Sequence, residues 1–224
     1  MHVLQGLAQQ PLASAEVVLV SPFARQMYSG MVPGLVAGRY TADACAIALG
    51  PLPRAAGVRF VEASVVAFEA ASGRATLSNG EELVADVVSL DTGSVMNRDR
   101  IVGAREQALF VRPIEHFVKL LDGVFELATQ RALDVVVIGG GAAGVELALA
   151  FEHRLQALNE SGVRVALVTG GSSPLEGHGE STRVRVQRVL ARRRITVFRD
   201  SCTHIEAGSL TLAGGPRLAC DVPV

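Results

Sequence analysis

The sequence predicts an α/β fold built from two similar units in series, and three observations support this prediction. The first is a run from Asp134 to Val168 with the pattern strand, glycine-rich turn, helix and strand. The second is a matching strand pattern near the start of the chain, at residues 16–21. The third is a pair of similar hairpin-rich stretches, Val58–Asp86 and Ile195–Asp221. Strands that alternate with helices are typical of parallel sheets covered by helices.

The glycine-rich turn of the second unit follows a short apolar run, residues 134–138, that predicts a buried strand. The turn has GxGxxG spacing, in which the glycines permit a tight turn, close approach of a pyrophosphate and close packing of a helix on the strand. The N-terminus of that helix favours bound phosphate. The turn consists of Gly139, Gly140, Gly141, Ala142, Ala143 and Gly144.

The flanking residues favour a nucleotide site over an ordinary glycine turn. Apolar residues recur at helical spacing over Val145–Leu158, and Ser161 and Gly162 are expected to end this helix. A second strand follows over Val163–Val168. Strand, turn, helix and strand in this order begin a Rossmann-like dinucleotide-binding unit.

The first unit repeats this pattern without the glycine turn. Glu16–Ser21 match Arg164–Thr169 in apolar pattern and in the hydroxyl residue that ends the strand. The two hairpin-rich stretches predict a small β-meander in each unit, with a turn at Asn79-Gly80 in the first. The matched segments are Phe68-Glu69 with Ile205-Glu206, Ala75-Thr76-Leu77 with Leu210-Thr211-Leu212, and Leu83-Val84-Ala85-Asp86 with Leu218-Ala219-Cys220-Asp221.

The repeat also predicts that the N-terminal unit is incomplete and that the chain is cut at each end. Because Val145–Leu158 correspond to Met1–Gln10, the first strand and its glycine turn have no counterpart in the first unit. Cys220–Val224 correspond to the start of a central strand, which is predicted in the first unit at Asp86–Asp91. Pro223 lies where a ladder N–H is needed, so we expect that this strand is not completed normally.

We expect a first unit at residues 1–114, a linker helix at 115–131 and a second unit at 132–224. Pro at the start of a helix is common, so Pro113 and the residues after it favour a linker helix over a catalytic role for His116.

The composition excludes several classes of protein. The chain has 224 residues, 49% of them hydrophobic, which is enough for a sizeable core. A net charge of −1 gives no bulk electrostatic reason to bind nucleic acid or anionic lipid. No signal peptide and no apolar run of roughly 18 residues is present. We therefore expect a cytoplasmic location and no nucleic-acid partner.

The cysteines and histidines show no spacing typical of a metal site or a redox pair. Cys45, Cys202 and Cys220 are widely separated, which predicts free, buried thiols. A thiol–disulfide reductase would need a paired-cysteine motif. The histidines, which we expect at the surface or at the edge of the core, are His2, His116, His153, His178 and His204.

With both units in view, the chain resembles the flavoproteins with two dinucleotide-binding domains, the pyridine nucleotide-disulfide oxidoreductase superfamily. Within it, the chain is similar to type II NADH dehydrogenases and to flavoprotein oxidoreductases linked to selenide, water dikinase. The resemblance is carried by Val20-Ser21-Pro22, residues 28–34, residues 86–94, and the GxGxxG turn with Val145-Glu146-Leu147-Ala148. It implies that the first unit is of the FAD-binding type and that the second binds NAD(P).

The resemblance implies particular cofactor-binding residues. For NAD(P) these are the GxGxxG turn, Glu146 facing the nicotinamide ribose, and Thr169 with Gly170 at the strand end. For FAD they are Ser21 and Pro22 by the adenosine ribose, the Val65 backbone by the adenine, and Thr92, Gly93 and Ser94 near the pyrophosphate. FAD in this family rests its pyrophosphate on the first glycine turn. The absence of that turn from the first unit predicts weakened FAD binding.

The preference for NAD or NADP stays open. The strand end that often offers Asp or Glu to the ribose instead reads Thr169, Gly170, Gly171, Ser172 and Ser173. An acidic residue would favour NAD, and its absence admits a 2′-phosphate without requiring one. Arg183, Arg185 and Arg188 suggest phosphate ligands, but Arg183–Arg194 is more simply a helix with its arginines in solvent and Val186, Val189 and Leu190 facing inward.

The function that the resemblance implies is hydride transfer from NAD(P)H to FAD and then to an acceptor such as a quinone, without a catalytic side chain. The alternative is a non-catalytic NAD(P)-binding protein without flavin. Because a missing strand leaves a sheet edge unpaired, we also expect a homo-oligomer or rearranged termini.

Overall fold

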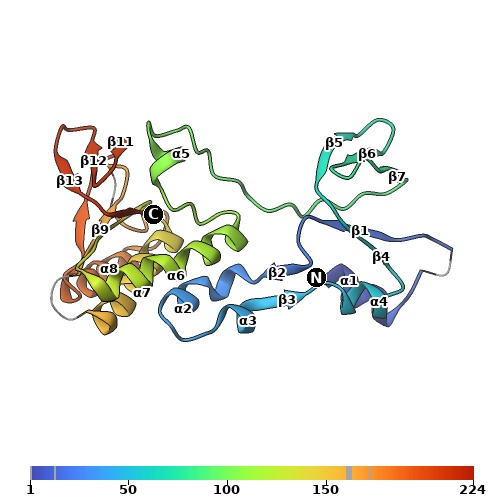
Figure 1. Ribbon diagram of the computed structural model, residues 1–224, viewed down its shortest axis with the longest axis horizontal. Helices are drawn as coiled ribbons and strands as arrows, with labels where there is room; N and C mark the ends of the chain where they lie inside the picture. The colour runs from blue at the N-terminus through green and yellow to red at the C-terminus, as the bar shows by residue number, and fades with distance from the viewer. Residues whose placement is uncertain (1, 13, 160–162, 172) are drawn as a thin grey trace. The chain divides into compact units, whose positions relative to one another are not determined.

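The computed structural model describes residues 2–12, 14–159, 163–171 and 173–224, which fall into two compact units (Figure 1). Unit 1 comprises the chain up to Tyr28 together with Ala46–Gly93, and unit 2 comprises Ser29–Cys45 together with Ser94–Val224. The predicted α/β class is confirmed. The predicted boundaries at residues 114 and 131 stay a prediction. Met1, Ser172 and the expected helix end at Ser161 and Gly162 lie outside the described residues.

Unit 2 is built on a parallel sheet with strand order β10-β9-β8-β14. The strands are β8 (Asp134–Ile138), β9 (Arg164–Val168), β10 (Thr196–Phe198) and β14 (Val222–Pro223). β8 pairs with β9 on one side and with β14 on the other. Val135, Val136 and Val137 are buried because β8 lies inside the sheet, which explains its uninterrupted apolar sequence.

Helices cover this sheet. The long ones are α6 (Ile114–Gln130), α7 (Ala142–Leu158) and α8 (Glu180–Arg192), and the short ones are η1 (Ser29–Met31), α2 (Val32–Val36), α3 (Ala42–Cys45) and α5 (Ala104–Gln107). α7 packs on β8 and β9 and buries Phe151 and Leu155. α6 packs on α7 and buries Phe117 and Leu121. Among the helices of the described residues, none is both long enough and apolar enough to cross a bilayer.

Unit 1 contains a shorter version of the same sheet. β1 (Val18–Ser21) pairs in parallel with β4 (Arg59–Glu62). Val18 faces Arg59 just as Ala166 faces Thr196 in unit 2. β2 (Arg25–Met27) and β3 (Ala46–Ala48) form an antiparallel pair. The helices are α1 (His2–Gln9) and α4 (Pro51–Ala55), which pack together.

Each unit carries the predicted three-stranded antiparallel meander. In unit 1 it is β5 (Val65–Glu69), β6 (Arg74–Leu77) and β7 (Glu82–Val84); in unit 2 it is β11 (Cys202–Glu206), β12 (Ser209–Leu212) and β13 (Arg217–Ala219). Both meanders have a register shift at the same place, after Val65 and after Cys202. Their second turns contain left-handed glycines, Gly80 and Gly215, as the Asn79-Gly80 prediction requires. The duplication inferred from sequence therefore extends to backbone details.

The strand predicted at Asp86–Asp91 is not formed. These residues are irregular and exposed, with Val87 89% and Leu90 68% exposed. The corresponding Val222 and Pro223 of unit 2 do form a strand, because β8 offers them a ladder of backbone groups. The described residues of unit 1 contain no counterpart of β8, so residues 86–91 have no strand to pair with.

Pro223 interrupts the hydrogen bonds of β14 but does not prevent the strand. Asp221 donates its N–H to the Asp134 carbonyl at 2.7 Å. With the two-residue period of a ladder, Pro223 would be the next donor, to the Val136 carbonyl, but it has no N–H. Val224 donates to that carbonyl instead, at 2.9 Å. The expectation that this strand is not completed normally agrees with the displaced donor, although Val222 and Pro223 do pair with β8.

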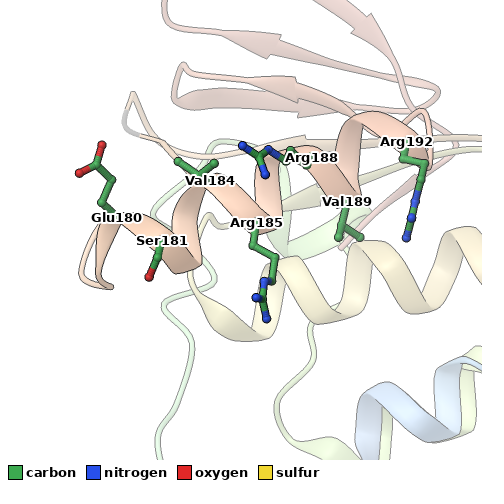
Figure 2. Close-up of a pocket in the computed structure, with 7 residues that line it drawn as sticks. All are labelled: Glu180, Ser181, Val184, Arg185, Arg188, Val189 and Arg192. Atoms are coloured by element: carbon green, nitrogen blue, oxygen red, sulfur yellow. The ribbon is translucent and has the colours of Figure 1, made fainter.

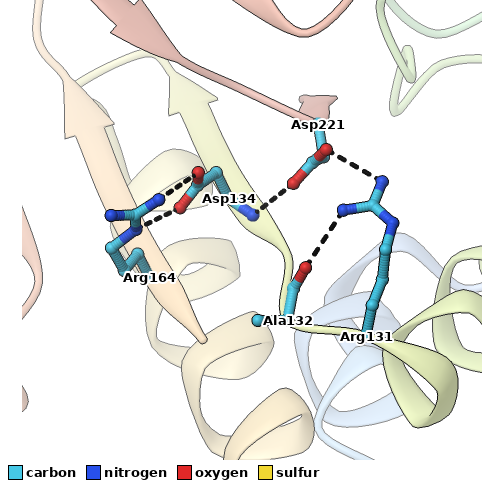
Figure 3. Close-up of polar contacts among 5 residues, drawn as sticks. All are labelled: Arg131, Ala132, Asp134, Arg164 and Asp221. Carbon is cyan, nitrogen blue, oxygen red and sulfur yellow. Dashed lines mark hydrogen bonds and ion pairs between the residues drawn. The ribbon is translucent and has the colours of Figure 1, made fainter. Parts of the chain in front are cut away.

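A charged network links the amino ends of β9, β8 and β14 (Figure 3). Arg164 pairs with Asp134 through both carboxylate oxygens. Asp221 accepts a hydrogen bond from the Asp134 backbone N–H at 2.8 Å and another from Arg131 at 2.9 Å. Arg131 also donates to the Ala132 carbonyl at 3.0 Å. The Arg131 guanidinium holds the pKa of Asp221 below its ordinary value of 3.8.

Replacing Asp221 should weaken unit 2 in a pH-dependent way. Asp221→Asn removes the charge that faces Arg131, and we expect a loss of about 1 kcal/mol in the free energy of unfolding at neutral pH. A carboxyl with a lowered folded pKa stabilises above its ordinary pKa of 3.8 and loses this effect as the pH falls through the lower folded value. Urea unfolding of both proteins should therefore show a difference that shrinks below pH 3.8.

Asp99→Asn is the matched control, because Asp99 pairs with Arg105 in an exposed position and its loss should leave the unfolding midpoint unchanged. Equal effects of the two substitutions would contradict a special role for Asp221.

Candidate nucleotide-binding site

The glycine turn joins β8 to α7 at the carboxyl edge of the unit 2 sheet. Gly139 has a φ of +143°, a conformation that L side chains rarely adopt. Its N–H donates to the Val168 carbonyl at 2.8 Å, which fixes the turn to β9. A Cβ on Gly144 would lie 1.8 Å from the Gly139 carbonyl oxygen, so only glycine lets α7 begin this close to the turn. The first and third glycines of the motif therefore shape the backbone.

The middle glycine faces open space. An added Cβ on Gly141 would meet no heavy atom within 4 Å. Gly141 is also the N-cap of α7, and no side chain caps this end of the helix. Ala142 and Ala143 begin the first turn and are exposed. An uncapped helix end beside an open glycine suits a diphosphate, so these residues fit the pyrophosphate of NAD(P).

A pocket of about 260 Å³ lies beside the glycine turn. It brings together Gly140, Gly141 and Thr169, which the sequence predicted as one site. Its other wall is a segment that sequence reasoning missed. The residues that line the pocket are Gly140, Gly141, Thr169, Ser173, Leu175, Glu176, Gly177 and His178. The only sequence signal for this wall was a proline and glycines, which mark a loop but not where it folds.

The remaining predicted NAD(P) residues are Thr169 and Gly170, at the end of β9, and Glu146, on α7. Thr169 is buried at the end of β9, and its backbone N–H donates to the Phe198 carbonyl at 3.0 Å. Gly170 follows it in a left-handed conformation and donates to the Asp200 carbonyl at 3.0 Å. Glu146 lies on the exposed side of α7 and outside the lining of the pocket.

The predicted FAD residues do not form a comparable site. The Ser21 hydroxyl at the end of β1 donates to the Phe23 carbonyl at 3.0 Å. Pro22 and Val65 are exposed, and Thr92, Gly93 and Ser94 lie in an exposed irregular segment at the boundary between the units. The described residues of unit 1 contain no GxGxxG turn.

α8 carries an arginine-rich face that borders a groove of about 580 Å³ (Figure 2). The groove is lined by Glu180, Ser181, Val184, Arg185, Arg188, Val189 and Arg192. Leu190 is buried, and Arg185 and Arg188 are exposed, which agrees with a solvated helix face. Arg183 is partly buried, so it does not fit the interpretation that all the arginines of this helix face solvent. None of these side chains lines the nucleotide pocket.

The thiols are protonated at neutral pH. Cys45, Cys202 and Cys220 are free and buried. Burial raises the pKa of all three, and that of Cys220 reaches about 12. The thiolate is the nucleophile and the metal ligand, so these positions supply neither at neutral pH. Within the part of the chain that the structure describes, no cluster of side chains suits a metal ion.

Two glycine substitutions should separate binding from folding. Gly141→Ala places a methyl group in open space, so the protein should fold normally but bind NADH at least about tenfold more weakly, because the methyl blocks the approach of the pyrophosphate. Gly144→Ala clashes with the Gly139 carbonyl and should lower the thermal midpoint as well. NADH titration together with thermal unfolding measures both effects. Unchanged NADH affinity in Gly141→Ala would exclude this turn as the phosphate site.

Comparison with solved structures places the same fold in known enzymes. NDH2 from Plasmodium falciparum in complex with NADH matches with a TM-score of 0.84 at 15% identity, over 97% of this chain and 51% of that one. The sulfide:quinone oxidoreductase from Aquifex aeolicus matches with a TM-score of 0.78 at 17% identity, over 98% of this chain and 55% of that one. These likenesses confirm the fold that the sequence predicted.

Sequence comparison shows the family. An NADH dehydrogenase-like protein of Mycobacterium tuberculosis is 33% identical over 191 residues, which cover 80% of this chain and 48% of the relative. The chain thus spans about half the length of that relative. Residues 1–221 match the pyridine nucleotide-disulphide oxidoreductase family, whose members are flavoproteins that use FAD and NAD(P)H. The glycine turn, the repeated meanders and these matches agree, and the chain belongs to the pyridine nucleotide-disulphide oxidoreductase family.

Proposed function

We propose that this chain acts in an FAD-dependent NAD(P)H oxidoreductase and binds the NAD(P)H. The observation that supports this most strongly is the open glycine turn at the start of α7, next to a pocket that ends at Thr169. A dinucleotide laid across the carboxyl edge of a parallel sheet uses these features together. The family membership and the NADH dehydrogenase-like relative support the same activity.

In this proposal the residues of unit 2 bind and orient the cofactor. The N–H groups of the glycine turn and of the first turn of α7 hold the pyrophosphate, and the adenosine ribose lies near Thr169 and Gly170. Glu146, further along the exposed side of α7, contacts the nicotinamide ribose. A flavin bound in such an enzyme would supply the redox chemistry between the nicotinamide and an acceptor. No protein nucleophile is needed, in agreement with the buried, protonated thiols.

A quinone is the acceptor that we propose. The Aquifex aeolicus protein of similar fold is a sulfide:quinone oxidoreductase.

The second candidate is an NAD(P)-binding protein that holds no flavin. It is favoured by one specific observation: the described residues of unit 1 contain no GxGxxG turn, and the Ser21 hydroxyl is engaged in its own local turn. Without such a turn the FAD pyrophosphate loses several charge-assisted hydrogen bonds, each of them worth about 1.5–3 kcal/mol.

Flavin absorbance and diaphorase activity separate the two candidates. The oxidoreductase proposal expects purified protein, incubated with FAD and desalted, to keep the yellow flavin absorbance and to lose it when NADH is added without oxygen. It also expects reduction of a soluble quinone by NADH, and Gly141→Ala should slow this reaction. Colourless protein that binds NADH but reduces neither quinone nor ferricyanide with excess FAD would overturn this proposal and support the second candidate.

We also propose that the chain forms a homo-oligomer. β1 pairs with β4 alone in the described residues of unit 1, and Val87, Leu90 and Val95 are highly exposed. An unpaired edge and exposed apolar side chains favour association. The cytoplasmic location expected from the sequence stays a prediction.

Light scattering tests the oligomer directly. We expect a mass that is a multiple of 23.5 kDa, and the double substitution Val87→Lys with Leu90→Lys should shift it towards 23.5 kDa by adding charge to the associating segment. A single mass of 23.5 kDa for the unaltered chain would rule the oligomer out.

A further inference from the structure

The nucleotide pocket contains a carboxylate, although the strand end does not. In dinucleotide-binding folds, an Asp or Glu about 20 residues after the glycine turn accepts hydrogen bonds from the ribose hydroxyls of NAD. This chain has Thr169 and Gly170 at the end of β9 instead. Glu176, seven residues beyond Thr169, nevertheless lines the same pocket as Thr169 and Gly141. In this pocket the carboxylate residue therefore belongs to the loop and not to the strand end.

The loop that carries Glu176 is held against the glycine turn. The Leu175 N–H donates to the Gly140 carbonyl at 2.8 Å, and the His178 N–H donates to the Leu175 carbonyl at 2.8 Å. The Leu175 side chain is buried, with 6% exposed. Its φ of 59° is in the left-handed region, which costs roughly 1 kcal/mol or more for a residue other than glycine. The hydrogen bond and the burial hold Leu175 in this conformation, so the position of Glu176 beside the pocket is defined by the fold.

We propose that Glu176 is the residue that sets the nucleotide specificity of this site, by accepting hydrogen bonds from the adenosine ribose hydroxyls of NAD(H) and repelling the 2′-phosphate of NADP(H). The inference rests on the proposed nucleotide site and adds to it a preference that the sequence left open. Among the described residues that line the pocket, Glu176 is the only carboxylate. A carboxylate can accept from both ribose hydroxyls, whereas a phosphate beside it meets like charge.

Two other side chains near the pocket are those of His178 and Asp200. His178 also lines the pocket. Asp200 accepts hydrogen bonds from the backbone N–H groups of Ser201 and Gly214, at 2.7 and 2.9 Å. Both oxygens of its carboxylate therefore already accept a hydrogen bond from the protein backbone. The arginines of α8 line the separate groove, not this pocket.

The test compares NADH and NADPH binding to the full chain by nucleotide fluorescence at pH 8. The unaltered chain should bind NADH about tenfold or more tightly than NADPH. Glu176→Gln should reduce this ratio by about tenfold, and Glu176→Arg should reverse it, because an arginine pairs with the 2′-phosphate. Glu176 is exposed, so both variants should keep the thermal midpoint of the unaltered chain.

Glu180→Gln is the matched control, since it removes a carboxylate from the start of α8, outside the nucleotide pocket. Its NADH to NADPH ratio should equal that of the unaltered chain.

Two negative outcomes separate the inference from the proposed function. If both nucleotides bind and Glu176→Gln leaves their ratio unchanged, the role of Glu176 is overturned while the proposed site stands. If the folded, unaltered chain binds neither nucleotide, the proposed site fails and the inference fails with it.

Discussion

The position of β8 between two parallel neighbours is the constraint on which the rest of unit 2 depends. Its backbone pairs with β9 and β14, and its buried valines fill the space between the sheet and α7. Because β8 is held on both sides, the glycine turn at its carboxyl end has a fixed starting point. The contact between Gly139 and Gly144 then aims the uncapped start of α7 at the pocket. The proposed nucleotide site therefore depends on a strand that is fixed in the sheet and on a turn that only glycine can make.

The two ends of this sheet have different roles. At the amino ends of the strands, a network of paired charges holds β8, β9 and the start of β14 in register. It consists of Asp134, Arg164, Asp221 and Arg131. At the carboxyl ends, the glycine turn and the loop at 173–178 leave a pocket with backbone N–H groups and one carboxylate. Charges that are paired among themselves stabilise the fold, whereas unpaired donors at the opposite edge remain available for a ligand.

Comparison of the two units shows which structural features the local sequence determines. The meanders have matching strands, register shifts and left-handed glycines, because hairpin geometry depends on residues close together in the chain. The two units differ immediately after their meanders. Residues 86–91 and 221–224 have similar patterns, yet only the second segment finds a ladder to join. A strand therefore forms only where a second segment is available to pair with it. An apolar pattern in one segment does not ensure that such a partner exists.

Much of this protein could be predicted from its sequence: the run from Asp134 to Val168, the two meanders and the GxGxxG turn follow from periodicity, turn chemistry and glycine spacing. Only the tertiary structure shows which predicted strands are paired. It also shows that Val224 donates the backbone hydrogen bond that Pro223 cannot donate. It also folded Leu175 onto Gly140 and so brought Glu176 to the pocket. These outcomes depend on contacts between residues far apart in the chain, which no local pattern encodes.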